Sequence, residues 1–253
     1  MLLNPNDFAY EYFHQPRGKD GDSGPLYMGK PRFPGQRPIL VKSSDPTDAI
    51  NEFIGCNVGQ RIGVNTPQAW LFKPCKADFD KICFGTAVAI EYLEGLDEKK
   101  GDLSDSEELA VQVIKCEFLH RLIFERDGLS YARVHEKVYA FDFAEGMLSQ
   151  YIPSKDNSYR LENGFTPYRW MLMNWEHESR KQNMKYLTEM SNKGGYGDLA
   201  ATVYMELREK FIELYNKDGF SDLVQDIKGA FTDYAAELAK EMIDAMQQSL
   251  VSF

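Results

Sequence analysis

Two charged residues of this 253-residue chain stand next to apolar runs, where a charge is unusual. Lys42 follows Ile39-Leu40-Val41, which predicts a short strand that ends in a lysine. Asp142 interrupts the largely apolar run 138–143. Burying a carboxylate is costly unless it is paired or binds a metal, and Mg²⁺ prefers hard oxygen ligands. Asp142 is therefore either a magnesium ligand or a carboxylate that caps a turn, and its own surroundings do not decide between the two.

Glu52 could hold the ammonium group of Lys42 in place. It lies on the helix that is predicted to follow the lysine strand. In this arrangement the carboxylate orients the ammonium group while the ammonium group contacts nucleotide phosphates. The alternative for Lys42 is a solvent-exposed side chain at a strand end, with its stem on the apolar surface.

Asp127 is a candidate general base. It precedes Gly128, which permits an unusual backbone angle, between a long predicted helix and two short predicted strands. A carboxylate on such a loop could accept the proton of an attacking hydroxyl group. A solvated Asp-Gly turn is the commoner role of such a pair. The four histidines (His14, His120, His135 and His177) are dispersed without ligand spacing, and we assign them no chemistry.

The elements that must position these residues change in type along the chain. Residues 1–38 are rich in Gly, Pro and aromatic residues and show no helical period. Asp45 and Pro46 are typical of a helix start, and Gly63 is typical of its end. The strands are predicted at 39–42, 68–72, 86–93, 133–134 and 138–143, and the later helices at about 104–124, 167–180, 183–191, 198–216 and 221–249.

This order predicts an α+β protein with two lobes. A β-rich N-terminal lobe with one helix is expected over residues 1–95, and a mostly helical C-terminal lobe over 96–253. The polar linker 97–102 separates them, and Ser104 with Glu107 forms a capping box for the first helix of the second lobe. In the last predicted helix, 221–249, Ser221 is the expected N-cap.

The composition excludes some classes of partner. The net charge of −10 would repel phosphate backbones, so we expect no nucleic-acid partner. No apolar run approaches the roughly 20 residues that cross a bilayer, and the N-terminus has no signal-peptide pattern. We therefore expect a cytoplasmic protein without a membrane partner.

Five segments, in the order in which they occur, resemble the HipA-like kinase family, which has a protein-kinase-like fold. The most specific is the helix start Asn51-Glu52-Phe53 followed by Arg61-Ile62-Gly63-Val64-Asn65-Thr66-Pro67. The run 35–42 is similar to the lysine strand of the family, and Ile90-Glu91-Tyr92-Leu93 to its hinge. The run 122–128 resembles the approach to its catalytic loop, and the resemblance extends over about 35–145.

The resemblance implies an ATP-dependent kinase that uses Mg²⁺ and transfers phosphate to an unidentified substrate, expected to be a protein. The roles that it implies are phosphate binding and catalysis for Lys42, support of Lys42 for Glu52, adenine binding for Glu91, Tyr92 and Leu93, the catalytic base for Asp127 and the metal ligand for Asp142.

The chain departs from the family in its catalytic loop. The family has a magnesium-binding asparagine five residues after the catalytic aspartate, and here that position is Ala132. Pairing Glu125 with Ser130 instead is also atypical, and Ala144 stands where a glycine is expected. An alanine cannot ligate a metal, so the alternative function is a pseudokinase that acts as a nucleotide-binding or protein-interaction module.

Overall fold

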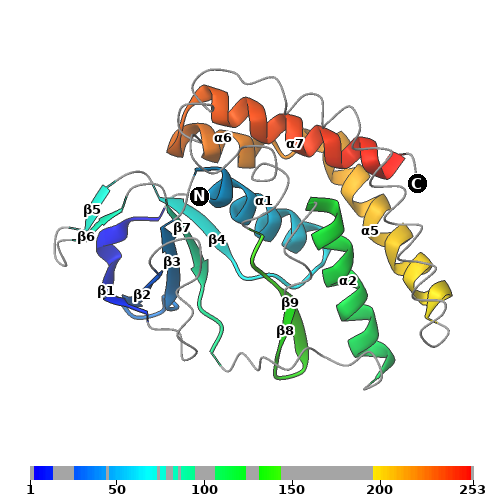
Figure 1. The fold of residues 1–253 in the computed structure, drawn as a ribbon, viewed down its shortest axis with the longest axis horizontal. Helices are drawn as coiled ribbons and strands as arrows, with labels where there is room; N and C mark the ends of the chain where they lie inside the picture. The colour runs from blue at the N-terminus through cyan, green and yellow to red at the C-terminus, as the bar shows by residue number, and fades with distance from the viewer. Residues whose placement is uncertain are drawn as a thin grey trace.

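The computed structural model separates the strands from most of the helices, as Figure 1 shows. A five-stranded antiparallel sheet lies at one side of the molecule, and the helices form the other side. The structure describes residues 3–13, 26–43, 46–72, 75–77, 82–84, 87–94, 106–123, 131–143 and 196–251. The predicted helices 167–180 and 183–191 and the candidate base Asp127 lie outside these residues, as does the boundary between the expected lobes.

The main sheet has the strand order β1-β2-β3-β7-β4. Its strands are β1 (Phe8–Tyr12), β2 (Leu26–Pro31), β3 (Ile39–Ser43), β4 (Ala69–Phe72) and β7 (Ala87–Glu91). A short 3-10 helix, η1 (Pro5–Asp7), precedes β1. Two separate hairpins complete the strands, β5 (Cys75–Ala77) with β6 (Ile82–Phe84), and β8 (Tyr131–Val134) with β9 (Lys137–Ala140).

The apolar side chains on the two faces of the sheet belong to two different clusters. Side chains alternate between the faces along each strand. On β3, Ile39 and Val41 join a small apolar cluster on the outer face with Phe8 and Tyr10 of β1. Leu40, on the opposite face, packs against the main core. That second face is the one that meets the helix following β3.

The helix α1 (Pro46–Ile62) is the centre of the main core. It is buried on nearly all sides, as expected of a helix enclosed by a sheet and by other helices. It contacts β4 and β7 on one side and α2, α5 and α6 on others. Gly63, at φ 91°, ends the helix as predicted from its freedom to adopt a left-handed conformation.

The described helices after the sheet are α2 (Glu107–Ile123), α5 (Gly197–Asp218), α6 (Ser221–Ala230) and α7 (Asp233–Val251). None of the helices in the described ranges is long and apolar enough to cross a membrane. In Figure 1, α6 and α7 lie on the side of α1 that faces away from the β8–β9 hairpin.

Three local differences from the sequence-based expectations have simple causes. The Gly- and Pro-rich residues 1–38 contain two strands, β1 with a period-2 pattern of aromatic side chains and β2, whose glycine and proline are typical of turns. The N-cap of α2 is Ser106, whose Oγ accepts a hydrogen bond from the Leu109 N–H at 3.2 Å. The expected helix 221–249 is divided into α6 and α7, because Thr232 Oγ1 accepts from the Ala235 N–H and starts a new helix.

Ser221 is therefore not the N-cap of one long helix. It is the first residue of α6, and the N-cap position is occupied by Phe220, which has no side-chain capping hydrogen bond. Phe220 adopts a left-handed conformation, with φ 55°, and its side chain is fully buried. Packing of an aromatic ring, rather than a polar cap, determines where α6 begins.

Candidate functional site

Lys42 and Glu52 meet between β3 and α1. Lys42 lies on the same sheet face as Leu40, because the two are two residues apart on β3, and this face packs against α1. Glu52 lies in the second turn of α1 and is fully buried. Lys42 Nζ is 3.2 Å from Glu52 Oε2. The proximity that the sequence predicted for this pair is confirmed.

Asp142 completes a cluster of three charges. Lys42 Nζ donates a hydrogen bond to Asp142 Oδ1 at 2.9 Å, across 100 residues of sequence. The lysine side chain is only 14% exposed, whereas that of Asp142 is 54% exposed. Asp142 thus presents a carboxylate to solvent directly beside a buried ammonium group, which is the position in which it could contact a ligand that enters from outside.

The apolar run 138–143 predicted a strand that contains Asp142, but Asp142 lies outside the strand. The strand β9 ends at Ala140, and Asp142 has φ 65°, which is uncommon for a residue with a Cβ atom. Such backbone strain persists only where the surroundings hold it. Here Lys42 holds the carboxylate, and the next residue, Phe143, anchors the chain in the core.

The charges of the cluster are mutually dependent. Burial lowers the pKa of Lys42, but the carboxylates of Glu52 and Asp142 more than offset it, so the pKa is raised and the lysine stays charged. Burial raises the pKa of Glu52, and Lys42 opposes this effect. Lys42 is the main cause of the lowered pKa of Asp142. Asp142 is therefore the more readily ionised carboxylate of the two that share one ammonium group.

Phe143 fixes the backbone beside Asp142. Its N–H donates to Glu52 Oε2 at 3.0 Å, and its fully buried ring lies 4.7 Å from that of His120 on α2. Gly55 of α1 makes room for the ring, because a Cβ atom there would lie 2.6 Å from Phe143 Cγ and Cδ2. The sequence analysis assigned no role at the site to Phe143, His120 or Gly55. The signal that could have found Gly55 is a glycine inside an apolar helix, which usually has a packing reason.

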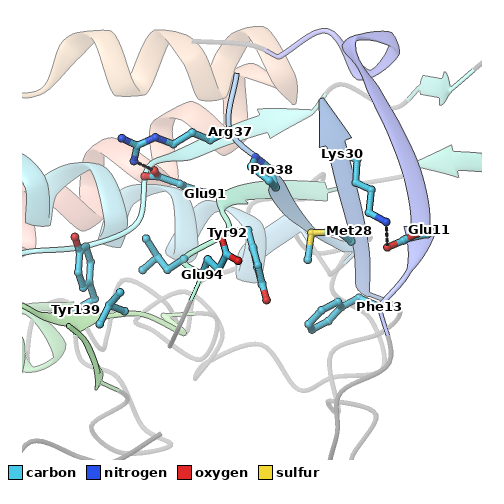
Figure 2. A pocket seen from close by; sticks show the side chains of 12 residues that line it. Glu11, Phe13, Met28, Lys30, Arg37, Pro38, Glu91, Tyr92, Glu94 and Tyr139 are labelled. Carbon is cyan, nitrogen blue, oxygen red and sulfur yellow. Dashed lines mark hydrogen bonds and ion pairs between the residues drawn. The ribbon is translucent and has the colours of Figure 1, made fainter. Parts of the chain in front are cut away.

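A cleft of about 560 Å³ lies at the other end of the same sheet face. Met28 of β2 pairs with Leu40 in the register of the sheet, so both share the face of Lys42. Figure 2 shows the side chains around this cleft, with the Arg37–Glu91 and Lys30–Glu11 ion pairs at its rim. Its lining includes Phe13, Met28, Tyr92, Leu93, Val134 and Tyr139.

The three expected hinge residues border this cleft. Glu91 ends β7, and its carboxylate pairs with Arg37. The Tyr92 N–H donates to Pro38 O at 2.9 Å, which ties the segment after β7 to the start of β3. The Tyr92 ring packs edge-on against Phe13, with 6.1 Å between ring centroids. The ion pair with Arg37 occupies the Glu91 carboxylate. A ligand in the cleft would therefore contact residues 91–93 chiefly through their backbone and through the flanking side chains.

Of Asp127 and Ala132 in the predicted catalytic loop, the structure describes only Ala132. Asp127 lies outside the described residues. Ala132 is in β8, is 2% exposed and pairs with Tyr139 of β9. Within the described ranges, no three His, Cys, Asp or Glu side chains gather to hold a metal ion.

Asp142 is compatible with a magnesium ion that is bound together with phosphates. Mg²⁺ commonly uses one or two carboxylates, substrate phosphates and several waters in such sites. Asp142 supplies one half-exposed carboxylate. The second carboxylate of the cluster is that of Glu52. Its Oε1 atom is buried and has no hydrogen-bond partner among the described residues. The donor set therefore fits a nucleotide-borne ion.

Comparison with known proteins bears on the fold. No family model and no curated protein matches the sequence. Among solved structures, the Helicobacter pylori proinflammatory kinase CtkA is similar, with a TM-score of 0.54 over 95% of this chain and 96% of that chain, at 10% sequence identity. At this identity the likeness establishes the fold alone. The chain has a two-lobed, protein-kinase-like α+β fold, with a β-rich N-terminal lobe and a helical C-terminal lobe.

Proposed function

We propose that this protein binds ATP with Mg²⁺ in the cleft beside β7 and uses it as a HipA-like kinase. The observation that carries the proposal is the convergence of Lys42, Glu52 and Asp142 at one end of the sheet face that also lines the cleft. A lysine held by a glutamate, next to an aspartate that can hold Mg²⁺, is the arrangement that protein kinases require. The kinase-like fold supports the same function.

Each residue of the cluster would act on a different part of the nucleotide. Lys42 would bind phosphate oxygens, and the buried carboxylate of Glu52 would keep its ammonium group in place. Asp142 would hold Mg²⁺, which neutralises phosphate charge when it is bound. The segment Glu91 to Leu93 would receive the adenine base through its backbone, with Met28 and Tyr139 on either side of the ring.

The transfer itself would move the γ-phosphoryl group to a hydroxyl group of a protein substrate. The bond to the β-phosphate oxygen breaks as the bond to the hydroxyl oxygen forms, and Asp127 would accept the hydroxyl proton. ADP leaves with the bridging oxygen.

A pseudokinase is the second candidate, and Ala132 favours it. The alanine is buried on β8 and has no oxygen ligand to offer a second magnesium ion. Loss of one ligand would leave transition-state charge less well neutralised, and about 1.4 kcal/mol of lost stabilisation is a tenfold loss in rate. We therefore expect nucleotide binding to be retained better than catalytic turnover.

Calorimetry with ATP, with and without Mg²⁺, tests the binding proposal. We expect magnesium-dependent heat from the wild-type protein and none from the Lys42→Ala or Asp142→Ala variant. An absence of both heat and thermal shift at millimolar nucleotide would overturn the proposal.

Phosphotransfer distinguishes the kinase from the pseudokinase. Incubation with γ-labelled ATP should give faint autophosphorylation or none if Ala132 has removed an essential ligand. Strong labelling that disappears in the Asp127→Ala variant would instead identify an active kinase, in which another residue replaces that ligand.

A further inference from the structure

The C-terminal end of α1 contacts the turn that joins α5 to α6 and the first turn of α6. The guanidinium group of Arg61, in the last turn of α1, donates to both carboxylate oxygens of Asp222, with 2.8 Å between Nη1 and Oδ1. Its Cζ atom also lies 5.8 Å from the centre of the Phe220 ring. A bidentate hydrogen bond from an arginine to a carboxylate restricts the orientation of the guanidinium group as well as its distance from the carboxylate. The contact joins residues that are 161 positions apart.

The turn between α5 and α6 is held in one conformation by its backbone and by the packing of Phe220. Gly219 and Phe220 both have positive φ, and the Phe220 ring is fully buried, 5.2 Å from that of Phe211. Asp218 Oδ1 accepts a hydrogen bond from the Phe220 N–H at 2.9 Å, which stabilises the turn locally. A left-handed phenylalanine costs energy that only its packing can offset. The turn is thus held in one conformation, with Phe220 and Asp222 presented toward α1.

Arg61 also neutralises a concentration of negative charge. Asp218, Asp222 and Asp226 all act on its guanidinium group and raise its pKa, with the hydrogen bond that Arg61 donates to Asp222 as the largest effect. The hydrogen bond from Arg61 is in turn the main cause of the lowered pKa of Asp222. Without Arg61, two of these carboxylates would face each other one turn apart on α6. The start of α6 and α1 would then lose this ion pair, and the two carboxylates of α6 would repel each other.

We propose that Arg61 and Asp222 are positioning residues for the nucleotide site, acting through α1 on Glu52, a role that rests on the proposed function. Glu52 and Arg61 are nine positions apart on one helix, roughly 13 Å along its axis. A helix of this length moves as a rigid body, so a tether at Arg61 restrains the position of Glu52. The Glu52 carboxylate in turn holds Lys42 and the N–H of Phe143, and through them Asp142.

This arrangement makes the C-terminal helices part of the site. Residues of α1, α5, α6 and α7 belong to one continuous apolar core, and α1 also contacts α5 and α6 directly. The position of Glu52, and with it the cluster of Lys42, Glu52 and Asp142, therefore depends on the packing of the C-terminal helices against α1. Loss of the Arg61–Asp222 pair should populate conformations in which α1 has moved and the cluster is incomplete. The apparent affinity for nucleotide then falls in proportion to the fraction of molecules in which the cluster is complete.

Two native thiols report on movement of α1 without any nucleotide. Cys56 on α1 and Cys116 on α2 are both fully buried, and burial raises the pKa of each thiol. Alkylation followed by peptide mass spectrometry gives a labelling rate for each cysteine. In the Arg61→Ala variant we expect Cys56 to label about tenfold faster, while Cys116 labels as in the wild type, because only α1 has been released.

The second measurement is the affinity for ATP with Mg²⁺. We expect the dissociation constant to rise about threefold to tenfold in Arg61→Ala and less in Arg61→Lys, which keeps the charge but not the planar fork. The matched control is Lys240→Ala, which removes the exposed Lys240–Asp244 pair of α7 and should change neither measurement.

The outcomes separate this proposal from the proposed function. If wild-type protein binds no nucleotide, the proposed function fails, but selective labelling of Cys56 still supports the tether. Equal acceleration at Cys56 and Cys116 would show general destabilisation and overturn the positioning role. Unchanged labelling and unchanged affinity in Arg61→Ala would overturn it as well.

Discussion

The two ends of the sheet face that carries the candidate site differ in the kind of contact that holds their side chains. At the end that is proposed to bind phosphate, called the phosphate end below, Lys42, Glu52 and Asp142 come from three separate elements and are linked by buried or partly buried ion pairs. At the end that is proposed to receive the adenine, called the hinge end below, the cleft is lined mainly by apolar and aromatic side chains, and its Arg37–Glu91 pair has an arginine that is 79% exposed.

The difference indicates where single residues matter. A buried charge is costly without its partner, so each member of the phosphate-end cluster depends on the others. Exposed pairs with a single contact contribute little, because solvent screens them and side-chain entropy opposes them, whereas bidentate pairs such as Arg61–Asp222 are an exception. We therefore expect the phosphate end to be sensitive to charge and the hinge end to be sensitive to shape. Four experiments test this comparison.

The largest effect is expected from Lys42→Met. It leaves the Glu52 carboxylate fully buried with only the Phe143 N–H as a partner among the described residues, so unfolding should become easier by about 3–5 kcal/mol, and ATP binding should be lost. Urea denaturation and calorimetry measure the two quantities. Adding Glu52→Gln to this variant should restore much of the stability but not the binding, because the buried charge is removed while the phosphate ligand stays absent.

Lys30→Met is the matched control for the stability change. Lys30 lies on the same sheet face and pairs with Glu11 at 2.7 Å, but the two side chains are 61% and 56% exposed. Its loss should change the free energy of unfolding by less than about 1 kcal/mol. Equal losses for the two lysines would contradict the distinction between the two ends.

Gly55→Ala should have the next largest effect. The added methyl group would lie 2.6 Å from the Phe143 ring and 2.9 Å from Ile123 Cδ1, which should cost about 1–3 kcal/mol of stability. Because Phe143 anchors the backbone next to Asp142, magnesium-dependent ATP binding should also weaken, on the order of tenfold.

Gly59→Ala separates these two effects. Its methyl group would lie 2.5 Å from Leu119 Cδ2 and 2.7 Å from Thr66 Cγ2, so it crowds the same helix away from Phe143. We expect a similar loss of stability without the loss of affinity. If both variants bind ATP equally well, Phe143 does not position Asp142.

A smaller effect is expected from the pH dependence of Asp142. Because its pKa is lowered in the folded protein, chiefly by Lys42, its ionised form stabilises the fold above the unfolded pKa. This contribution is lost as the pH falls below about 4 and through the lower folded pKa. The stability difference between wild type and Asp142→Asn should therefore shrink in that range. A difference that stays constant from pH 6 to pH 2.5 would show that the Lys42–Asp142 pair does not couple to folding.

The smallest effect is expected from Arg37→Ala at the hinge end. Arg37 is largely exposed, and the Tyr92 N–H still donates to Pro38 O in its absence. The dissociation constant for ATP should change by no more than about threefold. A tenfold loss measured by calorimetry would show that an exposed ion pair maintains the hinge, and the contrast between the two ends would no longer hold.

Local sequence patterns were sufficient for the parts of the fold that depend on neighbouring residues. The apolar run before Lys42 predicted β3, and the Pro46 start and Gly63 end predicted α1, because strand periodicity and helix termini depend on a few adjacent side chains. The pairing of Lys42 with Glu52 followed, since a helix that directly follows a strand packs back on the sheet. The sequence by itself thus determined the α+β class and two members of the charged cluster.

Tertiary structure decided what depends on residues that are far apart in the chain. The left-handed conformation of Asp142 and the notch that Gly55 provides for Phe143 result from contacts between α1, α2 and the segment after β9. The tether between Arg61 and Asp222 likewise joins elements that no local pattern relates. Periodicity shows which face of an element is buried, but not which distant side chain it meets, because that depends on how the complete core packs.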